Sequence, residues 1–161
     1  MSKFAKPFID LPSQMNLEHY EYQNEEDSQE YSFFSNGPRG KIKKLVVFSM
    51  VRNEPPMYNL AFGDVDSETG EINDKVNSNN KDRDIVLATV ANTINDFSDH
   101  HGNHYVFAIG STPARTRLYQ MGIAGLLDEI QNDFELWGYK DGDWHDFQRS
   151  VNYEAFLVKR K

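Results

Sequence analysis

Residues 104–113 read His-Tyr-Val-Phe-Ala-Ile-Gly-Ser-Thr-Pro, an almost wholly apolar run that leads into a turn and a helix start. Such a short apolar run is typical of a strand buried on both faces, in the middle of a mixed or parallel sheet. Thr112 suits the N-cap of the following helix, and Pro113 suits its first position, where a missing N–H costs nothing. This strand and helix predict an α/β fold.

Three strand-like segments precede this unit. They cover residues 31–34, 41–51 and 58–65, with turn-forming residues at 35–40 and a Pro-Pro pair at 55–56 between them. Because the connections are short, the three strands are expected to form an antiparallel meander. A weaker alternation of tyrosines and charges at residues 19–23 predicts a further short strand.

An amphipathic helix is predicted between the meander and the central strand. Its apolar residues recur at helical spacing, and they are Leu87, Val90, Ala91, Ile94 and Phe97. The polar segment 73–84 before it is expected to be a loop, with Asp82 or Asp84 as the N-cap.

The second helix, which begins at Pro113, is followed by strands to the end of the chain. Its expected buried stripe consists of Leu118, Met121, Leu126 and Ile130. Gly122 and Gly125 either permit close packing or split the helix in two. Residues 134–139 and the segment from Trp144 onward predict a hairpin around the turn 140–143, and residues 153–158 a final strand.

Together these elements predict an α/β (α+β) fold with a single mixed sheet, an opening antiparallel meander, two main helices and a C-terminal hairpin. Ribonuclease-H-like domains share this order of elements, an analogy that does not fix function. Residues 1–30 are interpreted as an acidic N-terminal arm and residues 31–161 as a single globular domain. The acidic run in the arm is typical of a solvated loop, and a partner-facing arm is the alternative.

Composition narrows the functional classes. The 161 residues are 39% hydrophobic and 13% aromatic, which is enough for a packed core. Lys and Arg total 17 against 25 Asp and Glu, a net charge of −8. Binding to nucleic acid would therefore need a local basic patch, and no membrane partner is expected. The absence of cysteine excludes disulfides and thiolate chemistry, and the start of the chain lacks the pattern of a signal peptide, so a cytoplasmic protein is expected.

The first candidate site is the turn into the second helix. Arg115 and Arg117 lie in the first turns of that helix, where the helix dipole disfavours cations. Two arginines there indicate an anion, and Ser111 and Thr112 add hydroxyl donors beside the free N–H groups. Three interpretations fit the arginines: they bind a ligand phosphate, pair internally with carboxylates such as Asp64, or are exposed to solvent.

The second candidate is acidic. Asp64 and Asp66 close a strand, and with Asp74, or with Asp82 and Asp84, they could hold Mg²⁺ for phosphoryl chemistry. The alternative is an ordinary strand end with turn-forming aspartates. A ribonuclease-H-like fold would be expected to carry an essential acid on its first core strand, and residues 41–51 contain none, which counts against a metal nuclease. We expect neither a metal nor a cofactor.

Two further groups of polar residues receive structural interpretations. The lysines at positions 41, 43 and 44 are read as one edge of a strand, where they oppose aggregation. His100, His101, His104 and His145 are read as loop histidines.

Three segments carry a resemblance to a known family. They are residues 58–64 (Tyr-Asn-Leu-Ala-Phe-Gly-Asp), residues 79–82 (Asn-Asn-x-Asp) and residues 110–119 (Gly-Ser-Thr-Pro-x-Arg-x-Arg-Leu-Tyr). The chain resembles, over roughly residues 31–161, a family of small uncharacterised bacterial proteins described as a domain of unknown function. The resemblance implies a bacterial, cytoplasmic setting and no mechanism. It supports treating the three segments as one constellation of Asp64, Asn80, Ser111, Thr112, Arg115 and Arg117.

The sequence favours a binding protein with an anion or phosphate site, for a nucleotide or nucleic acid, at the strand-to-helix turn. A non-enzymatic protein–protein interaction module, such as one half of a two-gene system, is the alternative, with structural arginines. A metal-assisted phosphoryl-transfer enzyme or nuclease is the second alternative. Burial separates the first two: arginines in an open cleft indicate a ligand, and arginines sealed by carboxylates indicate architecture.

Overall fold

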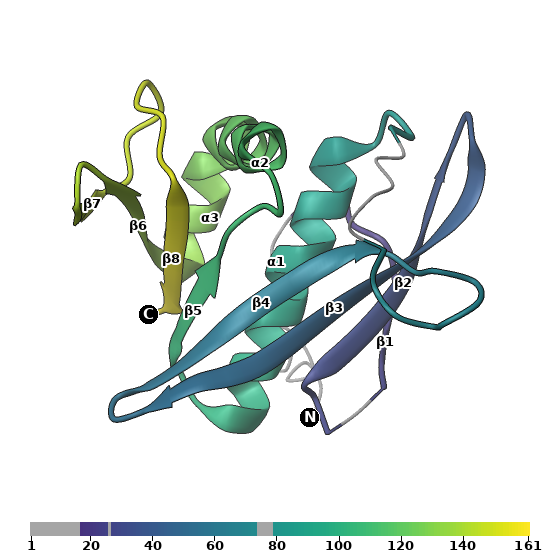
Figure 1. Cartoon of the computed structure of the whole chain (residues 1–161), viewed down its shortest axis with the longest axis horizontal. Helices are drawn as coiled ribbons and strands as arrows, with labels where there is room; N and C mark the ends of the chain where they lie inside the picture. The colour runs from purple at the N-terminus through teal and green to yellow at the C-terminus, as the bar shows by residue number, and fades with distance from the viewer. Residues whose placement is uncertain (1–16, 26, 74–78) are drawn as a thin grey trace, which may run out of the picture.

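The computed structural model describes residues 17–25, 27–73 and 79–161, which form one eight-stranded mixed sheet and three helices (Figure 1). The strands are β1 (Tyr22–Asn24), β2 (Glu30–Gly37), β3 (Gly40–Asn53), β4 (Pro56–Asp64), β5 (Tyr105–Ala108), β6 (Phe134–Lys140), β7 (Asp143–Asp146) and β8 (Ala155–Arg160). The helices are α1 (Arg83–His101), α2 (Pro113–Gly125) and α3 (Leu127–Asp133). The predicted α/β class, with a single mixed sheet, is confirmed.

Strands β2, β3 and β4 form the predicted antiparallel meander. Strands β2 and β3 are longer than predicted, because Gly37 pairs directly with Gly40 and leaves only two residues for the turn. Gly40 has a φ of 86°, a left-handed conformation that favours glycine and closes so tight a turn. The predicted turn at residues 35–40 is therefore too wide.

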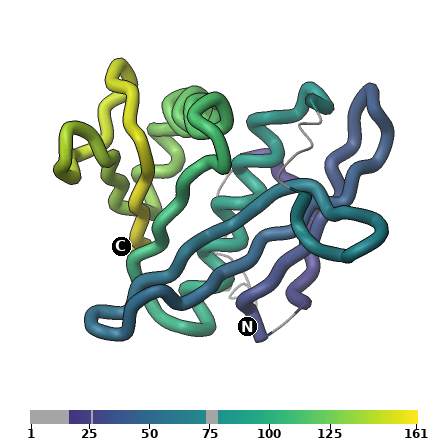
Figure 2. The backbone as a smooth tube through the Cα atoms, viewed as in Figure 1, coloured from purple at the N-terminus to yellow at the C-terminus, as the bar shows by residue number. Residues whose placement is uncertain are grey.

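The order of strands in the sheet is β1-β2-β3-β4-β5-β8-β6-β7, which places β5 in the middle as predicted. Strand β5 runs parallel to β4 and antiparallel to β8, which returns between β5 and β6 (Figure 2). The prediction of a strand over 104–110 buried on both faces is wrong. Only four residues pair, and Val106 is buried whereas Tyr105 and Phe107 on the opposite face are half-buried beside Trp137 and Trp144.

Helix α1 confirms the predicted amphipathic helix and packs on the inner face of the sheet. The ring of Phe97 stacks on Phe48, with centroids 4.3 Å apart, and meets Tyr58 edge-on at 4.8 Å. Asp82 occupies the N-cap position, but its side chain makes no capping hydrogen bond. The carboxylate instead accepts hydrogen bonds from Tyr20 and Ser35, so the side chain predicted as a cap bonds residues distant in sequence.

Helix α2 begins as predicted, since Thr112 Oγ1 accepts a hydrogen bond from the Arg115 amide at 3.2 Å. Its predicted buried stripe is half right: Ile130 is buried and Leu126 packs against the core, but both lie beyond the end of α2. Leu118 and Met121 are 39% and 48% exposed, and Thr116, Gln120 and Gly122 face inward instead. Close packing explains the difference, because a Cβ on Gly122 would lie 1.8 Å from Leu87 Cδ1. The helix also ends at Gly125, so both expected roles of the two glycines are found.

The C-terminal hairpin of β6 and β7 is confirmed, with its turn at residues 141–142. The final strand starts at Ala155 rather than at the predicted Tyr153. Tyr153 does not pair in the strand because its ring packs over Gly138, where an added Cβ would lie 2.2 Å from the ring.

Part of the predicted N-terminal arm packs on the sheet. Strand β1 pairs with β2, and the Tyr20 amide donates to Thr89 Oγ1 of α1 at 2.9 Å. Residues 1–16 of the arm lie outside the described residues. Among the helices of the described ranges, none combines the length and the apolar character that crossing a membrane requires.

Candidate functional site

A polar groove of about 370 Å³ lies where β4 ends and α1 begins, and residues of α2 line one side of it. We call it the polar groove. Its charged and amide-bearing walls are Lys44, Asp64, Asn79, Asn80, Lys81, Asp82, Arg83 and Arg115. The groove thus brings together Asp64, Asn80 and Arg115, one residue from each of the three segments that the sequence had grouped.

Lys44 and Asp64 form a buried ion pair in the floor of the groove. They face each other across β3 and β4, and their side chains are only 10% and 9% exposed. The interpretation of Lys44 as an edge-strand lysine is wrong, because β3 lies between β2 and β4 and this side chain points inward. A buried pair of this kind is costly to break, since the remaining charge loses its counter-ion.

Asn80 ties the loop before α1 to the hairpin of β2 and β3. Its side-chain amide donates to Ser35 Oγ at 3.0 Å and to the Gly40 carbonyl at 2.9 Å. Its Oδ1 accepts from the Arg39 amide at 2.7 Å. These three hydrogen bonds hold the loop against the hairpin, so the buried Asn80 side chain positions this wall of the groove.

Asp82 links the same wall to the N-terminal segment. Its carboxylate accepts hydrogen bonds from the Tyr20 hydroxyl at 2.7 Å and from Ser35 Oγ at 2.5 Å. Burial, followed by the hydrogen bond to Asp82, raises the pKa of Tyr20 above its ordinary value. The carboxylate predicted as a helix cap or metal ligand is thereby engaged with two hydroxyls.

Arg115 lies at the junction of the groove with a second cavity. Its Nη1 donates to Ser111 Oγ at 3.0 Å, and both residues also line that cavity. Arg117, two positions along α2, is exposed and lies with Thr112 in a separate depression beside Gln120 and Glu154. The structure therefore separates the two arginines, and the Thr112 hydroxyl accepts from the Arg115 amide as the cap of α2.

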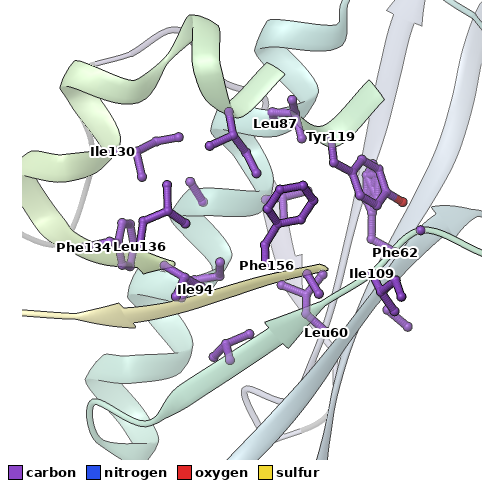
Figure 3. Close-up of a pocket in the computed structure, with 18 of the residues that line it drawn as sticks. Leu60, Phe62, Leu87, Ile94, Ile109, Tyr119, Ile130, Phe134, Leu136 and Phe156 are labelled. Carbon is purple, nitrogen blue, oxygen red and sulfur yellow. The ribbon is translucent and has the colours of Figure 1, made fainter. Parts of the chain in front are cut away.

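The second cavity, which we call the apolar pocket, has a volume of about 290 Å³ (Figure 3). Its walls come from α1, α2, α3 and the inner faces of β4, β5, β6 and β8, and they include Leu60, Ala91, Ile94, Ala108, Ile130, Phe134, Leu136 and Phe156. Tyr119 packs on Phe62 at one end, and Phe134 and Leu136 lie at the other (Figure 3). Phe62, Leu87, Arg115 and Tyr119 line both the pocket and the groove, so the two cavities adjoin.

Asp66, Asp84, His100 and His104 have local partners, and Asp84 pairs with Arg83 at 3.6 Å. Asp66 Oδ1 accepts from the amides of Glu68 and Thr69, as expected of a turn-forming aspartate. His100 and His104 each hydrogen-bond a backbone carbonyl, and His100 and His101 belong to the last turn of α1 rather than to the loop. Asp74 lies outside the described ranges, and within them no three potential ligands cluster around a metal position.

Several site residues escaped the sequence reasoning. Lys44, Lys81 and Arg83 supply most of the positive charge of the groove. For Lys44 a signal was present: it alternates in phase with Val46 and Phe48, which face the core. The apolar pocket had no such signal, because its walls have the composition of any core.

Comparisons with known proteins place the chain. A search of curated proteins and a search of solved structures found no match. A family model matches residues 16–161, which extends the resemblance upstream of Tyr31 to include β1. The chain therefore belongs to the family described as a family of unknown function, DUF6934.

Proposed function

We propose that the chain is a binding protein for a small anionic ligand, with Arg115 as the principal contact. The observation that carries the proposal is the charge of the polar groove. Among the described lining residues, Lys44, Lys81, Arg83 and Arg115 stand against Asp64 and Asp82, and Arg83 also pairs with Asp84 at 3.6 Å, which leaves a small local excess of positive charge in a chain of net charge −8. Such a concentration attracts anions even when the whole protein is acidic.

The geometry around Arg115 suits recognition of a carboxylate or a phosphate. A guanidinium presents five N–H donors in a planar fork that pairs with two oxygens at once. The bond to Ser111 fixes one nitrogen and places a hydroxyl beside the fork. Charge-assisted bonds of this kind are about twice as strong as neutral ones.

Binding is favoured over catalysis by what the groove carboxylates contact. Asp64 pairs with Lys44, and Asp82 accepts from Tyr20 and Ser35. Both carboxylates thus act as structural acceptors, which supports a ligand site over a phosphoryl-transfer centre. Phosphate-bearing compounds, nucleotides included, and simple carboxylates are the classes to test.

The test compares two arginines that lie two residues apart on α2. Thermal unfolding and calorimetric titration with phosphate esters and carboxylates are carried out on the wild type, Arg115→Gln and Arg117→Gln. A ligand at 100 times its Kd adds about 2.7 kcal/mol of stability, a rise in Tm of roughly 5–10 °C for a chain of this size. We expect Arg115→Gln to weaken binding at least about tenfold and Arg117→Gln to leave it unchanged.

Two outcomes count against the proposal. Equal losses in both variants would mean that general electrostatic attraction, not a site, holds the anion. A wild type that none of the anions stabilises would leave the groove charges with a purely architectural role.

A further inference from the structure

We infer that the ligand is an amphipathic anion, whose apolar tail fills the apolar pocket while its head group contacts Arg115. The inference rests on the proposed anion site and specifies the rest of the molecule. Its basis is the adjacency of two unlike cavities, which meet at Phe62, Leu87, Arg115 and Tyr119.

The shape and lining of the pocket decide what the tail is. A volume of about 290 Å³ is just below the usual range of ligand sites, roughly 300–1,000 Å³, and so suits a small ligand. Beyond Ser111, Arg115 and Tyr119 at one end, the lining side chains are aliphatic or aromatic. A buried water needs two to four hydrogen-bond partners, which such a lining does not offer. Methylene groups, in contrast, make favourable van der Waals contacts with every wall.

The same lining argues against a nucleotide base as the occupant of the pocket. A base carries several donors and acceptors, and each would lose water without gaining a partner among Ile94, Phe134 and Leu136. An alkyl or simple aryl tail has no such groups. The chemistry of the pocket therefore selects an acid with an apolar chain.

The position of the charge gives the ligand a direction. Arg115 and Tyr119 come from α2 and line both cavities, so they mark the end of the pocket that joins the groove. Ile130, Phe134 and Leu136 lie at the end away from Tyr119 (Figure 3). The head group therefore stays at the solvent-facing mouth while the tail runs inward between α1 and β5. Ile109, which is 50% exposed, lines the pocket from the turn after β5 and gives the mouth an apolar rim.

Calorimetric titration of the full chain tests this with a graded series of probes below their micelle-forming concentrations. The series comprises acetate, butanoate, hexanoate and octanoate, with octyl phosphate and inorganic phosphate to compare head groups and octanol as an uncharged tail. Each buried methylene is expected to tighten Kd by roughly three- to fourfold, so that octanoate binds about 100-fold more tightly than butanoate.

Two variants separate the tail from the head group. Ala108 lines the pocket from β5, so Ala108→Phe should fill it and abolish the dependence on chain length. Ala114→Phe, at an exposed position of α2, is the matched control and should bind like the wild type. Arg115→Gln should weaken octanoate at least about tenfold and leave octanol unchanged. If circular dichroism shows that Ala108→Phe does not fold, Ala91→Leu in α1 replaces it.

The possible failures are distinguishable. If acetate and octanoate bind alike, and both depend on Arg115, the anion site stands and the tail inference is overturned. If octanoate binds according to chain length but Arg115→Gln has no effect, the proposed anion site is wrong and the inference falls with it. If Ala108→Phe and Ala91→Leu both retain the chain-length dependence, the tail lies outside this pocket.

Discussion

Helix α1 meets the first strands of the sheet and the last ones in different ways. Toward β1 and β2 its polar side chains make directional contacts: Thr89 accepts from the Tyr20 amide, and Asp96 accepts from the Tyr31 hydroxyl at 2.7 Å. Toward β5 and β8 the same helix presents Leu87, Ala91 and Ile94, which line the apolar pocket, and its last turns are joined to β8 by Arg160, which donates to the Asn95 carbonyl at 3.0 Å and pairs with Asp99.

The difference shows how one helix can both hold the first strands by hydrogen bonds and line a pocket beside the last ones. Hydrogen bonds fix the separation of the elements they join, so the side of α1 facing β1 and β2 is drawn close to the sheet. Apolar contacts set no such distance, and Ala91 and Ala108 are too small to fill the space between α1 and β5. The room for a ligand therefore lies beside Leu87, Ala91 and Ile94, between the hydrogen bonds toward β1 and β2 and the Arg160 contacts at the end of α1.

Breaking the buried ion pair between β3 and β4 should have the largest effect on stability. Lys44→Met removes the partner of the buried Asp64 carboxylate, and we expect the free energy of unfolding to fall by about 3–5 kcal/mol. Urea denaturation measures the change, with the exposed neighbour Lys43→Met as the control. A Lys44→Met protein as stable as this control would show that the pair adds nothing. Adding Asp64→Leu to Lys44→Met should recover much of the loss.

Removing the Asn80 side chain should have a smaller effect in the same region. Asn80→Ala leaves the Arg39 amide and the Gly40 carbonyl without their side-chain partner, at an expected cost of about 1–3 kcal/mol. Asn79→Ala is the control, because Asn79 is exposed and accepts only a local bond from the Lys81 amide among its described contacts. Octanoate binding by Asn80→Ala should persist, since Asn80 does not line the apolar pocket. Equal stability of the two variants would contradict the role assigned to Asn80.

Alkaline pH should gradually weaken the packing of β1 and β2 against α1. Burial, with the nearby Asp96 and Asp99 carboxylates, raises the pKa of Tyr22 to about 12, and burial and the bond to Asp96 raise that of Tyr31. A raised pKa means that the folded state retains the proton, so this stability is complete below pH 10 and is lost as pH rises toward 12. The expected slope is about 1.4 kcal/mol per pH unit for Tyr22.

Urea denaturation between pH 8 and 11.5 measures this slope, and Tyr22→Phe is the informative variant. Its stability should fall less steeply above pH 10 than that of the wild type. Identical slopes would remove Tyr22 from the explanation.

Much of the fold could be predicted from local patterns. The alternation of Tyr58, Leu60 and Phe62 predicted both the strand and its inner face, and Asp64 follows in the same phase. Thr112 and Pro113 predicted where α2 begins, because capping chemistry depends only on neighbouring residues. The meeting of Asp64, Asn80 and Arg115 agrees with the grouping of their three segments.

Other features depend on distant contacts and could not be read locally. The inward side of α2 is set by the approach of Gly122 to Leu87, so Leu118 and Met121 turn outward despite their apolar character. The separation of Arg115 from Arg117 follows from that rotation of the helix. The apolar pocket arises from the spacing of seven elements, and no single segment of the sequence encodes such a space.

The parallel pairing of β4 with β5 has a consequence for how the chain folds. The hairpins of the meander join residues close in sequence, whereas Val106 must find both Tyr58 and Val158. Contacts between distant residues form slowly because a long loop must close first. The walls of the apolar pocket are drawn from both halves of the sheet, so we expect the pocket to be completed late in folding. A molecule that occupies the pocket would therefore bind and stabilise the fully folded chain and not partly folded forms.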